Sequence, residues 1–380
     1  MYWLASDVLI YFSLANSFIL TQDYASPYPP GALLVFLFPR LFTSDFPAYF
    51  LFFSLLMFAL FFVKLLLLIR IKGAKRDDLW LLFLIVSGVM MLPLALVRFD
   101  LIPSVLTLAA IILFLRNRPF WPEFFLALGT LVKIFPVVLL PLLVIHFWVR
   151  GEKIRLFKGL LVYFFTLVIF LAPFIFLDGG RGIVSDLNYQ LRRPVEIESL
   201  PASVLFAGAL GGAPATTFFA AGSHNVTLEG WDGLVNNLFT LFWIAGLALS
   251  YFWFFLQSAG KSFSSRELPP KVVKGSLLVL LIFVAFRPVF SPQYLIWLEP
   301  LVLWFLLYVS RKKMIFLGSL WCLTLFLTIM TLVFWGNLVA LSPSAILIQI
   351  LRNGLFLFFL AVIFTTRPEN IPVTFSHPKS

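Results

Sequence analysis

Long apolar stretches separated by short polar connections form the dominant pattern along this chain of 380 residues. About 20 consecutive apolar residues suffice for an α-helix to cross the hydrocarbon core of a bilayer. Because lipid offers no hydrogen-bonding partners, a crossing segment must satisfy its own backbone groups, as a helix does. The pattern therefore predicts an all-α polytopic membrane protein.

Eleven transmembrane or half-membrane helices are predicted from this pattern. They lie near 47–70, 79–97, 101–115, 119–132, 134–149, 157–177, 233–256, 272–287, 294–310, 314–335 and 344–364. Those at 101–115, 119–132 and 134–149 are short for a full crossing, so we expect tilt or burial among neighbours. A further helix should begin near residue 31, because the pair Pro29-Pro30 suits the start of a helix.

The chain reads as one transmembrane domain over 1–365, followed by a polar, proline-rich tail over 366–380. Two stretches, 1–30 and 178–232, are predicted as loops on the outer side of the membrane. The second contains "PATTFFAAGSHNVTLEGW", whose small, β-branched and aromatic residues predict a short β-hairpin.

Composition supports this class of protein, with 61% hydrophobic and only 12% charged residues. Soluble domains are typically about half apolar and a quarter charged. The net charge of +11 would suggest nucleic-acid binding in a soluble protein. In a membrane protein the positive-inside rule explains it better, so no nucleic-acid partner is predicted. The single cysteine, Cys322, excludes an intrachain disulfide.

The basic residues predict the topology, because 20 of the 28 fall in alternate connections. These are Lys64, Arg70, Lys72, Lys75, Arg76, Arg116, Arg118, Arg150, Lys153, Arg155, Lys158, Lys261, Arg266, Lys271, Lys274, Arg311, Lys312, Lys313, Arg367 and Lys379. Those connections and the C-terminus are therefore expected in the cytoplasm.

The remaining basic residues fall on the opposite side together with most of the acids. The cations are Arg40, Arg98, Lys133, Arg181, Arg192, Arg193, Arg287 and Arg352. The acids are Asp7, Asp23, Asp45, Asp100, Asp178, Asp186, Glu196, Glu198, Glu229, Asp232 and Glu299. A few cations placed among acids are not a topology signal, so we predict a functional site on the extracytoplasmic face.

Candidate chemistry begins in "SDVLIYFSLANSFILTQDYASPYPPG", where Asp7 and Tyr11 share one helix face and Tyr28 precedes the prolines. A capped, solvated loop is the alternative. In "VRFDLIPS", Arg98 and Asp100 occupy a tight turn between two spans. We expect these two charges to form a structural ion pair that closes the turn, with substrate binding as the alternative.

Lys133 lies in the apolar stretch "LGTLVKIFPVVLLPLL" and is followed by Pro136, which should interrupt the helix. An ionisable group at membrane depth is costly and functional by default. The alternative is a side chain that snorkels to the interface. We therefore predict a functional role for Lys133, and we expect Lys133→Met to fold at least as well because a buried cation is removed.

The stretch "FRPVFSPQYLIWLEPLV" contributes Arg287 at the end of one span and the donors Gln293 and Tyr294 at the start of the next. Glu299 follows inside the span, and Arg352 lies inside the last predicted span. A buried Glu and a buried Arg would most simply pair with each other, although Arg352 is also a candidate for binding substrate.

The connection "RRPVEIES" places Arg193, Glu196 and Glu198 close together on the outer side. We predict that it lies over the mouth of a cavity and helps to select an acceptor, with a solvated loop as the alternative. His224 is the single histidine expected on this side and is a weak candidate for a base. No Cys/His metal cluster occurs in the sequence. A cofactor is therefore not assigned, although isolated acids could hold Mg²⁺ or Mn²⁺.

Taken in order, "SDVLIY", "DYASPYPPG", "RFDLIPSVL", "VKIFPVVLLPLL", "RRPVEIESLPAS" and "FSPQYLIWLEPL" resemble the GT-C-fold membrane glycosyltransferases. The sequence is most similar to glycosyltransferase family 87, which includes polyprenyl-phosphate-mannose-dependent mannosyltransferases of the cell envelope. The resemblance extends from about residue 6 to residue 310. The family pattern has a membrane helix before the first outer stretch, so that helix is expected to be missing from this chain.

The resemblance implies a GT-C-like bundle with outer-face catalytic loops and an acidic catalytic base, which by position is Asp7. It implies a polyprenyl-phosphate sugar as donor and a lipid or glycan as acceptor, both used among membrane lipids on the outer face. With such a donor, we predict that Lys133 binds the donor phosphate. Inversion at C1 follows from a single displacement. A multi-pass transporter of a lipid-linked or small polar substrate is the alternative, because broken helices and buried charges also mark transporters. A lipid-glycan ligase of another fold is a third possibility.

Overall fold

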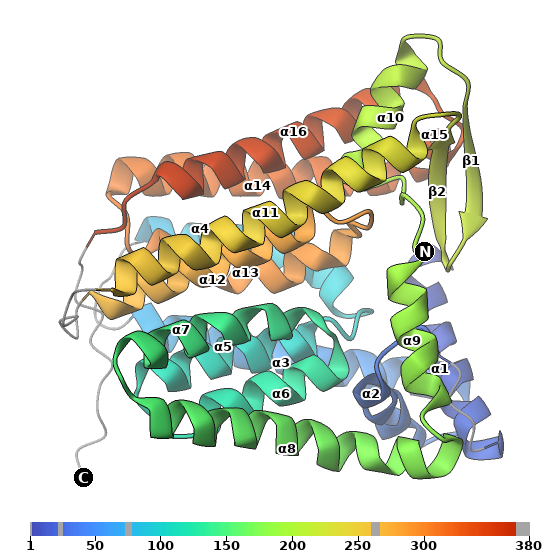
Figure 1. Cartoon of the computed structure of the whole chain (residues 1–380). Coiled ribbons are helices and arrows are strands. Elements are labelled where there is room, and N and C mark those ends of the chain that lie inside the picture. The colour runs from blue at the N-terminus through green and yellow to red at the C-terminus, as the bar shows by residue number, and fades with distance from the viewer. Residues whose placement is uncertain (1, 22–25, 73–77, 260–266, 370–380) are drawn as a thin grey trace.

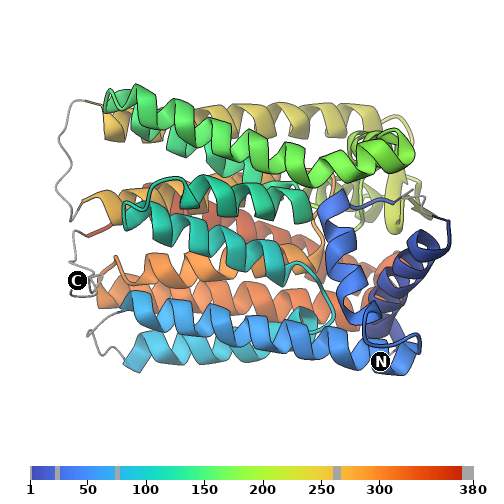
Figure 2. The same ribbon diagram turned by 90° about the horizontal axis from the view of Figure 1, so that it is seen from below.

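The computed structural model describes residues 2–21, 26–72, 78–259 and 267–369, and helices dominate them. The long helices are α3 (Phe46–Lys72), α4 (Asp78–Ala95), α8 (Lys153–Asp178), α11 (Asp232–Ser258), α12 (Leu268–Ala285), α14 (Arg311–Val333) and α16 (Pro343–Thr365). Among the described residues, these seven helices are long and apolar enough to cross a membrane. They run side by side in one bundle, as Figures 1 and 2 show, which agrees with the predicted polytopic architecture.

Shorter apolar helices complete the bundle. They are α5 (Leu101–Leu115), α6 (Trp121–Val132), η1 (Phe135–Leu139), α7 (Leu140–Val149), η2 (Pro292–Tyr294) and α13 (Leu295–Leu306). Every residue of α13 is buried, and α12 beside it is nearly so, which places these two helices at the centre. All the predicted ranges are therefore helical, and the short ones at 101–115 and 119–132 are largely buried among neighbours, as expected.

Several elements lie at one end of the bundle, and α1 and α9 run across its axis there (Figure 1). They are α1 (Tyr2–Thr21), α2 (Pro30–Arg40), α9 (Arg181–Leu191), α10 (Leu200–Leu210), β1 (Ala215–Ala220), β2 (Ser223–Leu228) and α15 (Trp335–Val339). Helix α1 occupies most of the described part of 1–30, whereas 178–232 combines the helices α9 and α10 with the two strands and their connections. The predicted hairpin is confirmed, with antiparallel pairing from Ala215↔Leu228 to Ala220↔Ser223.

Many of the basic connections gather at the opposite end. Arg155 Nη1 donates to Asn117 Oδ1 at 2.6 Å, which joins the α7–α8 connection to the α5–α6 connection. Lys274 near the start of α12 donates to the carbonyl oxygen of Phe364 at 2.8 Å, near the end of α16. Alternate connections thus share one end, as one consistent topology requires.

Lys64 and Glu299 correct two predictions about buried charges. Lys64 was assigned to a polar connection, but it lies inside α3 and its Nζ is 2.5 Å from Glu299 Oε2. Ser87 Oγ donates to the other Glu299 oxygen at 3.0 Å, and Trp321 Nε1 donates to Ser87. Glu299 therefore pairs with Lys64 and not with Arg352, because α13 packs against α3, which carries Lys64.

Candidate active site

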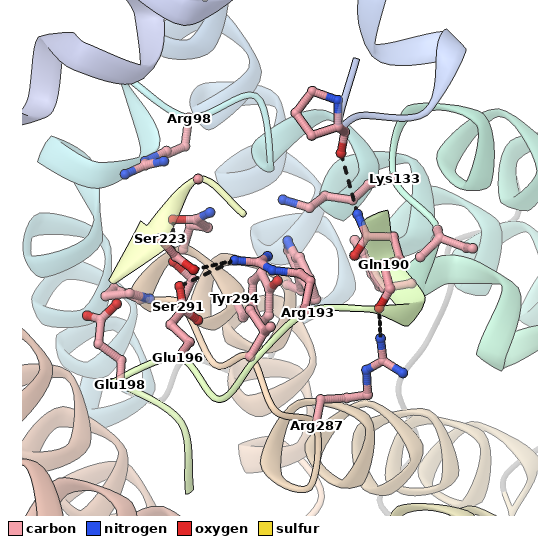
Figure 3. A pocket seen from close by; sticks show the side chains of 18 of the residues that line it. Arg98, Lys133, Gln190, Arg193, Glu196, Glu198, Ser223, Arg287, Ser291 and Tyr294 are labelled. Carbon is pink, nitrogen blue, oxygen red and sulfur yellow. Dashed lines mark hydrogen bonds and ion pairs between the residues drawn. The ribbon is translucent and has the colours of Figure 1, made fainter. Parts of the chain in front are cut away.

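A cavity of about 660 Å³ lies at the end of the bundle that carries α1, α9 and the hairpin. Segments far apart in the sequence line it, as the close view in Figure 3 shows. The predicted site residues in its wall are Asp7, Tyr28, Arg98, Lys133, Arg193, Glu196, Glu198, Arg287, Gln293 and Tyr294. The fold thus brings most of the predicted side chains together around one space.

Asp7 and Arg98 form an ion pair through Asp7 Oδ2 and Arg98 Nη2. Helix α1 lies across the end of the bundle and presents Asp7, whereas Arg98 follows the last turn of α4. The predicted pair between Arg98 and Asp100 is therefore wrong, because each of these charges faces a different partner. Arg98 holds the Asp7 carboxylate at the cavity wall.

Lys133 stands at a break in the helical backbone. Helix α6 ends at Val132, Lys133 is extended with φ −156° and ψ 136°, and Pro136 lies in the following η1. Lys133 Nζ bonds Asp100 Oδ1 at 2.5 Å, and Trp297 Nε1 donates to the same oxygen at 2.8 Å. The ammonium therefore lines the cavity, which excludes the snorkelling alternative. Asp100 is fully buried outside the lining and positions Lys133.

The predicted loop "RRPVEIES" is an extended connection held by backbone bonds. The Val226 amide donates to the Val195 carbonyl at 2.9 Å, and the Glu196 amide donates to the Pro288 carbonyl at 2.9 Å. These bonds fix the connection between the hairpin and the turn before η2. The connection therefore forms an ordered part of the cavity wall and is not a solvated loop.

Glu196 and Glu198 are buried carboxyls in this wall, with 4% and 3% of each residue exposed. Burial raises the pKa of Glu196, although Arg193 at 3.8 Å opposes the shift. Burial raises the pKa of Glu198 well above its ordinary value, and the charge of Glu196 adds to the shift. The Arg193 guanidinium also donates to Ser223 Oγ at 2.9 Å, which ties this cation to the hairpin.

Besides Asp100, the predicted binding residues Arg352 and Tyr11 also lie outside the lining. Arg352 Nη1 donates to the Glu198 carbonyl oxygen at 2.8 Å, and Gln349 Nε2 donates to it at 2.5 Å. Arg352 is therefore a positioning residue that fixes the backbone of Glu198. Tyr11 is buried and stacks on Phe36 with ring centroids 4.4 Å apart, which makes it part of the core.

Sequence reasoning missed several lining residues, among them Gln190, Ser223 and Trp335. Gln190 Nε2 donates to the Pro27 carbonyl at 3.4 Å, and Arg287 Nη2 donates to the Gln190 carbonyl at 3.4 Å (Figure 3). Gln190 thus links the stretch before α2 to the turn after α12. The polar residues of 181–191 could have indicated Gln190 from the sequence, since this segment is too polar to cross a membrane.

Part of the cavity wall is apolar. Val137 and Val138 of η1, Trp243 and Leu247 of α11, and Phe283 of α12 form it. Arg287 lies beside this wall, with its guanidinium carbon 5.1 Å from the centre of the Trp243 ring. The cavity therefore combines charged groups with an apolar surface that adjoins a peripheral membrane helix.

These features define a polytopic helical membrane protein with a charged, partly apolar cavity at one end of the bundle. Residues 27–186 match the family model of glycosyltransferase family 87. The match includes Tyr28, Arg98 and Lys133, and it confirms the resemblance to the membrane glycosyltransferases of that family. No protein of curated function matches the chain. Among the residues that the structure describes, no group of three or more His, Cys, Asp or Glu side chains is placed to hold a metal ion.

Proposed function

We propose that the protein transfers a hexose, with mannose as the first candidate, from a polyprenyl-phosphate donor to a lipid or glycan acceptor on the extracytoplasmic face. The observation that carries the proposal is the cavity itself, in which the Asp7 carboxylate and the cations Arg98, Lys133, Arg193 and Arg287 share one space with an apolar wall. The family match supports the glycosyltransferase class. The basic connections at the opposite end of the bundle support the outer location.

The donor phosphate is assigned to the side of the cavity that carries Arg287 and Lys133. The ion pairs of the described residues do not include Arg287, whereas Lys133 is paired with Asp100. Arg287 thus keeps charge available for an anion, and the adjoining apolar wall suits an isoprenoid chain. Cations placed beforehand in a water-poor site stabilise the charge that develops on a leaving phosphate.

The proposed reaction is a single displacement. Asp7 accepts the proton of the acceptor hydroxyl, whose oxygen attacks C1 of the donor sugar from the face opposite the phosphate. The C1–O bond to the phosphate breaks, and the electron pair leaves with the polyprenyl phosphate next to Arg287 and Lys133. One displacement inverts the configuration at C1. The transporter alternative has weaker support, because the cavity's charges gather at one end of the bundle.

The test is transfer from labelled polyprenyl-phosphate mannose to lipid acceptors in membranes that contain the protein. A positioned carboxylate base contributes about 10²- to 10⁴-fold to the rate. Asp7→Asn should therefore lower kcat by about that factor while the protein stays folded. Asp45→Asn is the matched control, because Asp45 is exposed and caps α3 outside the cavity. Near-normal turnover by Asp7→Asn would refute the assignment of the base.

A further inference from the structure

One side of the cavity is formed by aromatic rings of the hairpin and α15. His224 lies with its ring centroid 5.2 Å from that of Phe219 and 5.8 Å from that of Trp335, and all three residues line the cavity. Thr217 Oγ1 donates to the Val339 carbonyl at 2.8 Å, which joins β1 to α15. The three rings are therefore held in one wall by the hairpin and its contact with α15.

Glu198 supplies a hydrogen-bonding group that the protein leaves unused. Its Oε1 is buried without a hydrogen-bond partner among the described residues, although the side chain lines the cavity. A buried carboxyl without a partner is costly, so it calls for a ligand or an ordered water. In Figure 3, Glu198 and Ser223 lie toward one side of the cavity, whereas Lys133, Gln190 and Arg287 lie toward the other.

Fixed geometry distinguishes Glu198 from an ordinary surface acid. Asn353 Nδ2 donates to the Ser199 carbonyl at 2.9 Å, next to the bonds from Gln349 and Arg352 to the Glu198 carbonyl. Three side chains of α16 thus hold the backbone at this point. A binding group whose backbone is held by several hydrogen bonds keeps the orientation that specificity requires.

We propose that Glu198 and the rings of Phe219, His224 and Trp335 form a subsite for a pyranose unit of the acceptor. A pyranose ring has an apolar C–H face that suits an aromatic wall and a rim of hydroxyl groups that suits a carboxyl group. The raised pKa of Glu198 favours a protonated carboxyl, which both donates to and accepts from hydroxyl groups. The subsite selects an acceptor that already carries a sugar, and this reading rests on the proposed function.

The donor sugar is the other pyranose that this chemistry would recognise. Its phosphate is assigned to the side with Arg287 and Lys133, and its C1 must lie near Asp7. The acceptor is therefore the sugar that approaches from the opposite side, where Glu198 lies. Kinetics show which of the two sugars the subsite binds, since a subsite for the acceptor governs the KM for acceptor and not the KM for donor.

Binding is measured first, without catalysis, by saturation-transfer NMR with the methyl glycoside of a mannose disaccharide and the protein in nanodiscs. Loss of one hydrogen bond to a buried group changes affinity by about 2- to 12-fold. Glu198→Leu should raise the dissociation constant by about that factor, and Trp335→Leu should also raise it because it removes one ring of the wall. Glu198→Gln should retain most of the binding, because an amide still donates and accepts. Trp148→Leu is the control, since Trp148 is exposed in α7 and outside the cavity lining.

Transfer kinetics then follow with a mannolipid acceptor and with water as the competing acceptor. The Leu variants should raise the KM for the mannolipid and should not raise the KM for donor. The proposal is overturned if the wild type does not bind the disaccharide, if neither Leu variant weakens binding, or if the KM for donor rises instead. If binding falls as expected but the wild type transfers no sugar, the subsite stands and the proposed glycosyl transfer fails.

Discussion

Removal of the Lys133 ammonium should destabilise the protein, because Lys133 compensates a buried carboxylate. Asp100 is fully buried, and its Oδ1 lies 2.5 Å from Lys133 Nζ. Asp100 Oδ2 has no hydrogen-bond partner among the described residues, so the pair is the main compensation for this charge. The sequence alone suggested that Lys133→Met would fold at least as well as the wild type. The pair reverses that expectation.

Breaking a buried ion pair by removing one partner costs about 3–5 kcal/mol, because the other charge remains buried. The Lys133 side chain is 15% exposed, which favours the lower end, about 3 kcal/mol. The double variant Lys133→Met with Asp100→Asn should recover most of this loss. The amide oxygen that replaces the carboxylate still accepts the bond from Trp297, which the wild type makes at 2.8 Å.

Free energies of unfolding in mixed micelles, measured for the wild type, both single variants and the double variant, give the interaction energy directly. Donor kinetics of the double variant then test phosphate binding in a protein that has recovered most of its stability. A charge-assisted contact contributes about 1.5–3 kcal/mol, so the KM for donor should rise about 10- to 150-fold. A Lys133→Met variant as stable as the wild type would refute the compensation. An unchanged donor KM in the double variant would refute phosphate binding by Lys133.

Three further predictions concern Arg287 in the cavity and two positions outside its lining, Asp186 and Gly31. Arg287→Met should raise the KM for donor about 10- to 150-fold, whereas Arg311→Met, at the opposite end of the bundle, should not. Burial raises the pKa of Asp186 to about 6 in the folded protein, above its value in the unfolded chain. The folded protein therefore loses stability as the pH rises through about 6 and the buried carboxyl group ionises. The melting temperature of Asp186→Asn should therefore exceed that of the wild type by a margin that grows between about pH 4 and 7. Equal melting temperatures at pH 7 would contradict the burial argument. Gly31→Ala should lower the melting temperature, because a Cβ would lie 2.4 Å from the Leu131 carbonyl oxygen where α2 meets α6. A Gly31→Ala protein with unchanged stability would show that α2 can shift without cost.

Local features of the structure were predictable from the sequence by itself. Hydropathy located the helices, because a membrane crossing demands a long apolar run and an internally bonded backbone. Pro136 predicted the break beside Lys133, and the alternating residues of 215–228 predicted the hairpin. Charge placed most candidate site residues on one side of the membrane. The helix, break and hairpin signals each lie within a short stretch of consecutive residues, and the charge signal follows from the order of the connections, so none of them required knowledge of packing.

The partners of the charges were decided by the tertiary structure alone. Asp7 pairs with Arg98, Asp100 pairs with Lys133, and Arg352 bonds the Glu198 backbone, contrary to the pairs expected from proximity or type.

Lys64 and Glu299 give the physical reason, since they are 235 residues apart in sequence and meet because α3 packs against α13. Apolar periodicity is weak in helices that are hydrophobic all round, so the sequence does not show which face of one helix meets which face of another. A buried charge takes whichever opposite charge the packed bundle brings within reach. Lateral packing therefore decides which residues line the cavity and which lie behind its wall and position them.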